Sequence, residues 1–86
     1  MAKVVMYSTG MCPYCVRAEQ LLTRKGAEEI EKIRVDIEPE RLQEMMEKSN
    51  GQRSVPQIFI GDIHVGGYDD IVDLDMEGQL IPMLGS

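Results

Sequence analysis

Residues 4–15, which read VVMYSTGMCPYC, decide the fold that we expect for this chain. From Val4 to Tyr7 the side chains form a continuous apolar run rich in β-branched residues, which is typical of a strand buried on both faces. Gly10 lies in the loop that follows. Pro13 suits the first position of a helix because its backbone torsion is already helical and it has no N–H to leave unpaired. The stretch predicts a strand, a short loop and a helix that starts beside two cysteines.

The residues after this stretch extend it to a strand–helix–strand unit. Ala18, Leu21 and Leu22 recur at helical spacing, and Gly26 ends the helix. Residues 31–37 alternate between apolar and polar side chains, which predicts a strand with one wetter face. A strand, a helix and a second strand in this order require a right-handed crossover between parallel strands.

The second half of the chain predicts a helix, a hairpin and a last helical stretch. Pro39 begins a helix that ends near residues 50–51. Residues 57–60 and 63–65 predict two antiparallel strands joined by a two-residue turn at 61–62. Because the first strand pair is parallel and the second antiparallel, the four-stranded sheet is mixed.

The last helical stretch begins near Asp69 and turns Ile71, Leu74 and Leu80 toward the core. We therefore expect a small α/β fold, a strand–helix–strand unit followed by a β-hairpin, with helices flanking the sheet. One helix should cover one face of the sheet, and the later helices the other face or the end.

Composition excludes several classes of function. The 86 residues fit one domain over residues 1–86. Nine basic and fifteen acidic residues give a net charge of −6, which disfavours nucleic acid as a partner because its phosphates are repelled. No apolar run approaches the roughly 20 residues that cross a bilayer, and the N-terminus has no secretory signal pattern. We expect a cytoplasmic protein with no membrane partner.

The two cysteines, Cys12 and Cys15, stand in the order Cys-Pro-Tyr-Cys. A disulfide that closes so small a loop constrains the unfolded chain very little, so it is a poor structural staple. A zinc site normally takes four ligands, and His64 is the one other good candidate, so we expect no metal site. The spacing favours a redox pair.

Cys12 falls at the start of the helix, where unpaired backbone N–H groups and the positive end of the helix dipole stabilise an anion. The pKa of a thiol can fall there from about 8.5 into the range of roughly 3.5–7.5. We expect Cys12 to be the nucleophile. Cys15, one turn further in, suits a resolving thiol that attacks a mixed disulfide formed at Cys12. Tyr14 either contacts substrate or packs as a half-exposed aromatic ring on the helix.

Ser54, Val55 and Pro56 precede the strand at 57–60. In a fold of this kind a proline just before a strand typically follows a cis peptide bond. A cis Val55–Pro56 bond would turn the Val55 backbone toward the sulfur site, where it could pair with a cysteinyl peptide as a short added strand. The alternative is a proline that merely starts the strand.

Residues 66–70, Gly-Gly-Tyr-Asp-Asp, lead into the last helical stretch. The glycines permit a close backbone approach, and a helix start binds anions through its N–H groups. Such a site can hold an α-amino acid, with the helix N–H groups on its carboxylate and Asp70 on its ammonium. The alternative is simple helix capping, which can account for Asp69 entirely.

These three motifs resemble, in order and spacing, those of the glutaredoxin family, and the resemblance covers nearly the whole chain. Cys-Pro-Tyr-Cys is most similar to the bacterial dithiol class. The resemblance implies a thioredoxin fold, Pro56 in cis, and glutathione-dependent reduction of disulfides, especially of glutathione mixed disulfides. Glutathione would be the co-substrate, and disulfide-containing or glutathionylated proteins the partners. Nothing in the sequence indicates an obligate dimer, so we expect a monomer.

The resemblance also implies roles by position: Cys12 attacks, Cys15 resolves, and Val55 pairs with the cysteinyl backbone of glutathione. Thr9 stands where the family usually has a lysine near the glycyl carboxylate, and Arg53 or Gln52 is the candidate for that contact. The residues implied to bind glutathione are Tyr14, Arg53, Ser54, Val55, Pro56, Gly67, Tyr68, Asp69 and Asp70.

Two related functions fit parts of this pattern. Electron carriers reduced by a flavoprotein reductase share the fold and the Cys-x-x-Cys spacing but usually lack the acidic pair after Gly-Gly, so Asp69 and Asp70 favour glutathione. Relatives that hold an iron–sulfur cluster usually carry Cys-Gly-Phe-Ser, and Pro13 and Tyr14 would crowd a cluster here.

Overall fold

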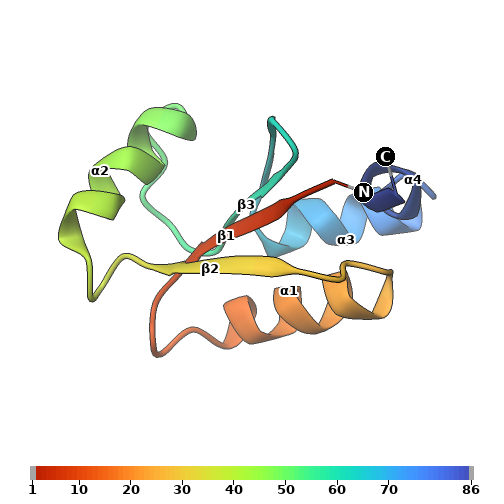
Figure 1. Ribbon diagram of the computed structural model, residues 1–86, viewed down its shortest axis with the longest axis horizontal. Helices are drawn as coiled ribbons and strands as arrows, with labels where there is room; N and C mark the ends of the chain where they lie inside the picture. The colour runs from red at the N-terminus through yellow and green to blue at the C-terminus, as the bar shows by residue number, and fades with distance from the viewer. Residues whose placement is uncertain (1, 86) are drawn as a thin grey trace.

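A computed structural model describes residues 2–85, with Met1 and Ser86 outside the described part, and its centre is the apolar strand near the N-terminus (Figure 1). The sheet has four strands in the order β2-β1-β3-β4. Within the described residues, no helix combines the length and the apolar character that a bilayer crossing requires. The elements in chain order are β1 (Val4–Ser8), α1 (Pro13–Arg24), β2 (Ile30–Arg34), α2 (Pro39–Lys48), β3 (Gln57–Ile60), β4 (Ile63–Gly66), α3 (Tyr68–Met76) and α4 (Leu80–Gly85).

Pairing along the sheet confirms the mixed topology expected from the sequence. β1 runs parallel to β2, with Val4 opposite Ile30 and Ser8 opposite Arg34. On its other side β1 runs antiparallel to β3, with Val4 opposite Ile60, and β3 and β4 form the antiparallel hairpin. The loop after β1 and the segment before β3 therefore meet at the same end of the sheet.

The side chains of β1 divide the core between the two faces of the sheet. Val4 and Met6 belong to the cluster under α1, α3 and α4, where Leu22 is fully buried. Tyr7 belongs to a smaller cluster under α2, where Met45 is fully buried. Figure 1 shows α1 and α3 on one face of the sheet and α2 alone on the other.

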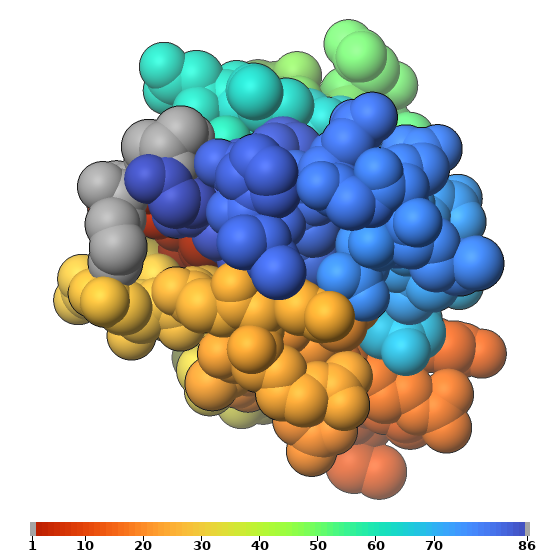
Figure 2. Space-filling model, turned by 90° about the vertical axis from the view of Figure 1, so that its right-hand side faces the viewer, coloured from red at the N-terminus to blue at the C-terminus, as the bar shows by residue number. Residues whose placement is uncertain are grey.

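Of the later helices, which were expected on the other face or at the end of the sheet, α2 covers the other face, but α3 packs on the face that α1 covers and α4 joins the same cluster. Ile71 of α3 and Leu80 of α4 are fully buried in the cluster that α1 also fills. Lys25, just after α1, forms an ion pair with Asp75 of α3 at 3.2 Å. In Figure 2 the C-terminal helices, in blue, lie directly against the orange end of α1. One helix covers only part of a four-stranded sheet, and α3 completes the layer that α1 begins.

β2 is shorter than predicted, since it ends at Arg34 and not at residue 37. The amide N–H groups of Ile37 and Glu38 both donate to the Arg34 carbonyl, which makes residues 35–37 a turn. Val35 is buried in the cluster under α2, while Ile37 is 65% exposed. The alternating pattern correctly predicted that Val35 is buried, but it did not predict that the strand ends at Arg34.

Two helices form the last helical stretch. α3 ends at Met76, and Gly78 has a φ of +74°, in the left-handed region that favours glycine. Leu80 then opens α4. The Ala2 amide donates to the Leu84 carbonyl at 3.3 Å, so α4 lies beside the start of the chain.

Tyr7 and Glu44 join the central strand to α2. The Tyr7 side chain is 1% exposed, and its hydroxyl donates to the Glu44 carboxylate. Burial, followed by this hydrogen bond, raises the pKa of Tyr7 to about 12. The same bond lowers the pKa of the Glu44 carboxyl. At neutral pH the pair is therefore a neutral phenol donating to a carboxylate.

Met45 is the fully buried anchor of α2 on its face of the sheet. We expect Met45→Ala to lower the free energy of unfolding by about 2–5 kcal/mol, because it removes buried methylenes and leaves a cavity. Urea denaturation followed by circular dichroism measures this change. Met76→Ala, at a side chain that is 81% exposed, is the matched control and should change stability little. Equal effects of the two substitutions would contradict the packing described.

Candidate functional site

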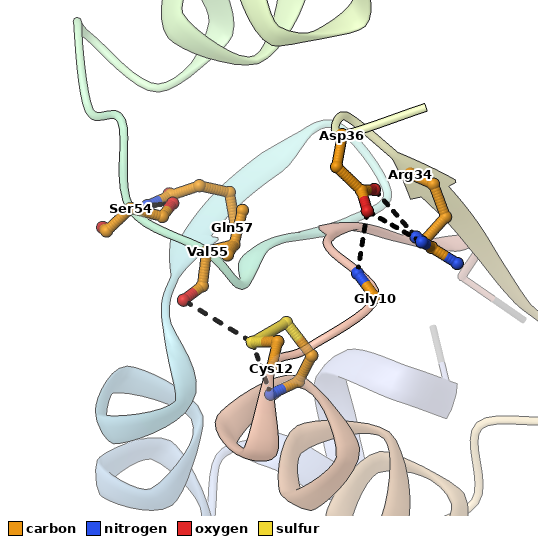
Figure 3. Close-up of a disulfide and its surroundings, with 8 residues drawn as sticks. Gly10, Cys12, Arg34, Asp36, Ser54, Val55 and Gln57 are labelled. Atoms are coloured by element: carbon orange, nitrogen blue, oxygen red, sulfur yellow. Dashed lines mark hydrogen bonds and ion pairs between the residues drawn. A yellow bond between two sulfur atoms is a disulfide. The ribbon is translucent and has the colours of Figure 1, made fainter. Parts of the chain in front are cut away.

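Cys12 and Cys15 lie where β1 passes into α1, and they are joined by a disulfide with their Cα atoms 5.2 Å apart (Figure 3). Cys12 is the N-cap of α1, as expected, and its sulfur accepts a hydrogen bond from the Cys15 amide at 3.1 Å. Pro13 is the first helical residue. Cys15 is 5% exposed whereas Cys12 is partly exposed. Of the two sulfurs, that of Cys12 is the one an external thiolate can reach in this disulfide, and the one that can attack an external disulfide once the pair is reduced.

Val55 faces this disulfide from the segment before β3. Its carbonyl oxygen lies 4.0 Å from the Cys12 sulfur, and Figure 3 shows the carbonyl pointing toward it. The Val55–Pro56 peptide bond is cis, as the sequence predicted. The peptide backbone before β3 is thus placed against the reactive sulfur, as an added strand would require.

A groove with a volume of about 210 Å³ runs from this segment to the start of α3. Tyr14 and Tyr68 stand on it with their ring centroids 5.9 Å apart, and the Arg17 guanidinium lies 5.4 Å from the Tyr14 ring centre. Arg53 is exposed and is not among the lining residues, so its contact with glutathione stays a prediction. The residues lining the groove are Tyr14, Gln52, Ser54, Val55, Pro56, Gln57, Gly67, Tyr68, Asp69 and Asp70.

The acidic end of the groove is shaped by Asp70. Its carboxylate accepts a hydrogen bond from the Gly67 amide at 2.8 Å, so of the two acidic residues that could cap α3, the one that does so is Asp70. The reason is geometric, since a side chain on the first turn reaches back to the N-cap amide from the third helical position. Gly66 has a φ of +117°, and a Cβ there would lie 2.3 Å from the Asp70 carboxylate. Glycine is therefore required at this position.

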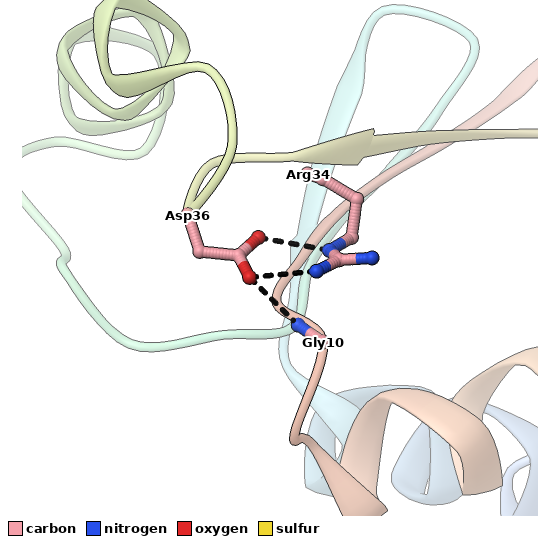
Figure 4. Close-up of polar contacts among 3 residues, drawn as sticks. All are labelled: Gly10, Arg34 and Asp36. Carbon is pink, nitrogen blue, oxygen red and sulfur yellow. Dashed lines mark hydrogen bonds and ion pairs between the residues drawn. The ribbon is translucent and has the colours of Figure 1, made fainter.

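Asp36 ties the loop before Cys12 to the end of β2 (Figure 4). One carboxylate oxygen accepts from the Gly10 amide at 3.1 Å and from the Arg34 guanidinium at 2.7 Å, and the other accepts from Arg34 Nε at 2.8 Å. Arg34, followed by the Gly10 amide, holds the pKa of the Asp36 carboxyl well below its usual range. A Cβ on Gly10 would lie 2.5 Å from Arg34 Nη2, so a larger residue there would make the Arg34 guanidinium shift.

Comparison with known proteins matches the Glutaredoxin family over residues 4–65. The chain is 51% identical over 84 residues to the glutaredoxin of Neisseria meningitidis serogroup B, covering 98% of each chain. It is 46% identical over 86 residues to the glutaredoxin of Pseudomonas aeruginosa, covering all of both. The chain belongs to the glutaredoxin family. With both cysteines present, it is a dithiol member and a glutathione-dependent thiol–disulfide oxidoreductase whose redox pair is Cys12–Cys15.

Solved glutaredoxin structures share its thioredoxin-like fold. The solution structure of glutaredoxin from Brucella melitensis superposes with a TM-score of 0.83 at 48% identity, over 98% of this chain and 89% of that one. The crystal structure of a buckwheat glutaredoxin–glutathione complex superposes with a TM-score of 0.84 at 34% identity, over 98% of this chain and 77% of that one. The α/β thioredoxin fold inferred from the sequence is confirmed.

Two groups of residues in this glutaredoxin were missed by sequence reasoning. Gly10 and Asp36 are 26 residues apart, and no local pattern signals that they meet. A second hollow, of about 380 Å³, borders the disulfide on another side and includes Thr9 among its lining residues.

Within residues 2–85, no group of three or more His, Cys, Asp or Glu is placed to hold a metal ion, and the absence of a metal site stays a prediction.

Asp36→Asn tests whether the Asp36 carboxylate stabilises the fold through its hydrogen bonds to Gly10 and Arg34, because that stabilisation should depend on pH. A carboxyl whose pKa is lower in the folded state stabilises the fold above its unfolded pKa of about 3.9 and loses that contribution as the pH falls through the folded value. We expect the substitution to lower the melting temperature of this glutaredoxin at pH 7. The difference from the unsubstituted protein should shrink below about pH 4.

The measurement is thermal unfolding by circular dichroism from pH 7 to pH 2. Asp62→Asn, in the exposed hairpin turn, is the matched control and should leave the melting temperature nearly unchanged. A melting-temperature difference for Asp36→Asn that stays constant across the pH range would show that the charge of Asp36 does not stabilise the fold through these hydrogen bonds.

Proposed function

We propose that this glutaredoxin reduces glutathione mixed disulfides of proteins, and also disulfides within proteins, while holding glutathione in the groove beside Val55. The observation that carries the proposal is the continuity between the Cys12 sulfur, the Val55 carbonyl 4.0 Å away, and a groove that ends at the start of α3. A tripeptide joined to Cys12 through its own cysteinyl sulfur would have that cysteinyl residue beside Val55 and one of its ends extending along this groove.

The orientation of the bound glutathione follows from the charges along the groove. Its γ-glutamyl end carries an ammonium and a carboxylate. Asp70, beside Asp69, suits the ammonium, and the N–H groups at the start of α3 suit the carboxylate. The cysteinyl backbone would pair with Val55 as a short added strand. Tyr14, 54% exposed on the groove, would cover the peptide.

Deglutathionylation needs only Cys12. Its thiolate attacks the glutathione sulfur of the mixed disulfide, the sulfur–sulfur bond breaks, and the protein leaves as a thiolate. Cys12 is then glutathionylated. The thiolate of a second glutathione attacks the sulfur of the bound glutathione, which releases glutathione disulfide and restores the Cys12 thiolate. The start of α1 stabilises the thiolate in both steps.

Reduction of a protein disulfide needs Cys15 as well. The Cys12 thiolate attacks one sulfur of the substrate and forms a mixed disulfide, releasing the other sulfur as a thiolate. The Cys15 thiolate then attacks the Cys12 sulfur, which frees the substrate and leaves Cys12–Cys15 oxidised. Two glutathione molecules return the pair to its dithiol form and leave as glutathione disulfide.

We further propose a monomer that acts in the cytoplasm, where glutathione maintains a reducing environment.

Cys15→Ser separates the two reactions. We expect the variant to retain most of its activity on a glutathionylated protein and to lose reduction of protein disulfides, because only the second reaction uses the resolving thiol. Cys12→Ser should abolish both. The assay couples formation of glutathione disulfide to glutathione reductase and NADPH consumption. Loss of both activities in Cys15→Ser would contradict this assignment of roles.

Asp70→Asn isolates the charge at the end of the groove, because an amide oxygen can still accept from the Gly67 amide and cap α3. We expect the KM for a glutathionylated peptide to rise about five-fold, as for loss of one exposed charge pair. The rate of Cys12 alkylation by iodoacetamide should not change. Asp73→Asn, exposed on the same helix and absent from the groove lining, is the control. An unchanged KM in Asp70→Asn would argue against the ammonium contact.

A further inference from the structure

Gln57 is a polar side chain buried at the start of β3 with 1% of its surface exposed. Its amide nitrogen lies 3.0 Å from the Ser54 carbonyl oxygen, 3.2 Å from the Ser54 hydroxyl and 3.3 Å from the Gln52 side-chain oxygen. Its amide oxygen lies 2.7 Å from His64 Nε2. A buried amide is stable only when its donors and acceptors are satisfied, and here both ends are.

The partners of Gln57 fix which way its amide points. A carbonyl oxygen such as that of Ser54 can only accept, so the Gln57 atom facing it is the nitrogen. The Gln57 oxygen consequently faces His64, whose Nε2 must carry a hydrogen. His64 is held on β4 by its pairing opposite Phe59, with the two rings 4.9 Å apart. Phe59 in turn packs in the core under α2.

The segment that Gln57 holds is part of the groove. Gln52 and Ser54 line it, yet residues 52–54 are exposed and have no regular secondary structure. The buried Ser49 hydroxyl donates to the Gln52 carbonyl at 3.1 Å, which anchors the start of the segment. Gln57 anchors its end, directly beside Val55. Two buried side chains, those of Ser49 and Gln57, therefore hold residues 52–54, and Gln57 is the one next to Val55.

We propose that Gln57 is a positioning residue for glutathione, with His64 orienting its amide. The proposal rests on the function proposed above, because it concerns the same groove. The Gln57 nitrogen fixes residues 52–54 before the ligand arrives, so binding does not have to order them. The chain of contacts runs from the Phe59–His64 ring pair through Gln57 to residues 52–54 of the groove. None of these contacts involves Cys12, so we expect the reactivity of its sulfur to be unaffected.

Gln57→Glu tests this division, because a carboxylate still accepts from His64 but donates nothing to Ser54 or Gln52. We expect the KM for a glutathionylated peptide to rise about three- to ten-fold, the loss of one to two hydrogen bonds, with kcat changed less than two-fold. The same peptide capped with 2-mercaptoethanol does not fill the groove, and its KM should not change. Gln20→Glu, at an exposed position on α1, is the control for the added charge.

Separate outcomes contradict the two proposals. If the unsubstituted protein shows no preference for the glutathionylated peptide over the 2-mercaptoethanol-capped one, the groove does not bind glutathione and the proposed function fails. If it shows that preference and Gln57→Glu retains it in full, the proposed role of Gln57 is wrong. Equal losses on both peptides, or slower alkylation of Cys12 by iodoacetamide, would also overturn it, since they indicate a general structural effect.

A measurement on the unsubstituted protein covers the case in which Gln57→Glu does not fold. In ¹⁵N NMR spectra, neutral His64 should be the tautomer with hydrogen on Nε2, and the Gln57 side-chain amide should exchange slowly with solvent. Binding of S-methylglutathione should shift the Gln57 side-chain resonances. The opposite His64 tautomer, or a rapidly exchanging Gln57 amide, would contradict the inference.

Discussion

The unpaired N–H groups at the first turn of α1 are the constraint on which the site depends, because they determine where an anionic sulfur is stable. Cys12 has an extended backbone, with φ −140° and ψ 92°, and this conformation brings its sulfur within 3.1 Å of the Cys15 amide. Pro13 starts the helix without an N–H of its own. The nucleophile, its stabilising amides and the resolving cysteine are thus supplied by four consecutive residues.

The rest of the site is brought to this sulfur by the order of the strands. Because β1 lies between β2 and β3, the loop after β1 is flanked by the turn after β2 and by the segment before β3. Polar side chains hold the loop after β1, the segment before β3 and the start of α3. Asp36 holds the Gly10 amide, Gln57 holds residues 52–54, and Asp70 holds the Gly67 amide. In all three cases an irregular backbone that regular pairing leaves unsatisfied is held by a polar side chain.

This arrangement separates reactivity from recognition. The reactivity of Cys12 depends on α1 and on its own backbone, whereas the groove depends on the segment before β3 and on the start of α3. The two meet at Val55, whose carbonyl oxygen is 4.0 Å from the sulfur. A chain of this size builds only a shallow groove, so the glutathione binding that we propose depends on backbone pairing and a few charges more than on enclosure.

What the sequence determined by itself is local. Pro13 after Cys12 indicated the helix start, and the alternation around Ile33 and Val35 indicated that these two side chains are buried, whereas the cis bond before Pro56 was expected only once the fold had been inferred. The first two depend on the conformational preference or periodicity of neighbouring residues, which can be recognised without knowing the rest of the fold. The resemblance to glutaredoxins supplied the full set of residues expected to bind glutathione, and all of them except Arg53 line the groove.

What only the tertiary structure decided involves residues far apart in the chain. The end of β2 at Arg34, opposite the end of β1 at Ser8, and the joining of α3 to the face of α1 follow from contacts that no periodicity predicts. The hydrogen bond from the Gly10 amide to Asp36 spans 26 residues, and the contact between Gln57 and His64 joins β3 to β4. The physical reason is that these contacts depend on strand order and layer assignment, which the chain reaches by burying its apolar surface as a whole.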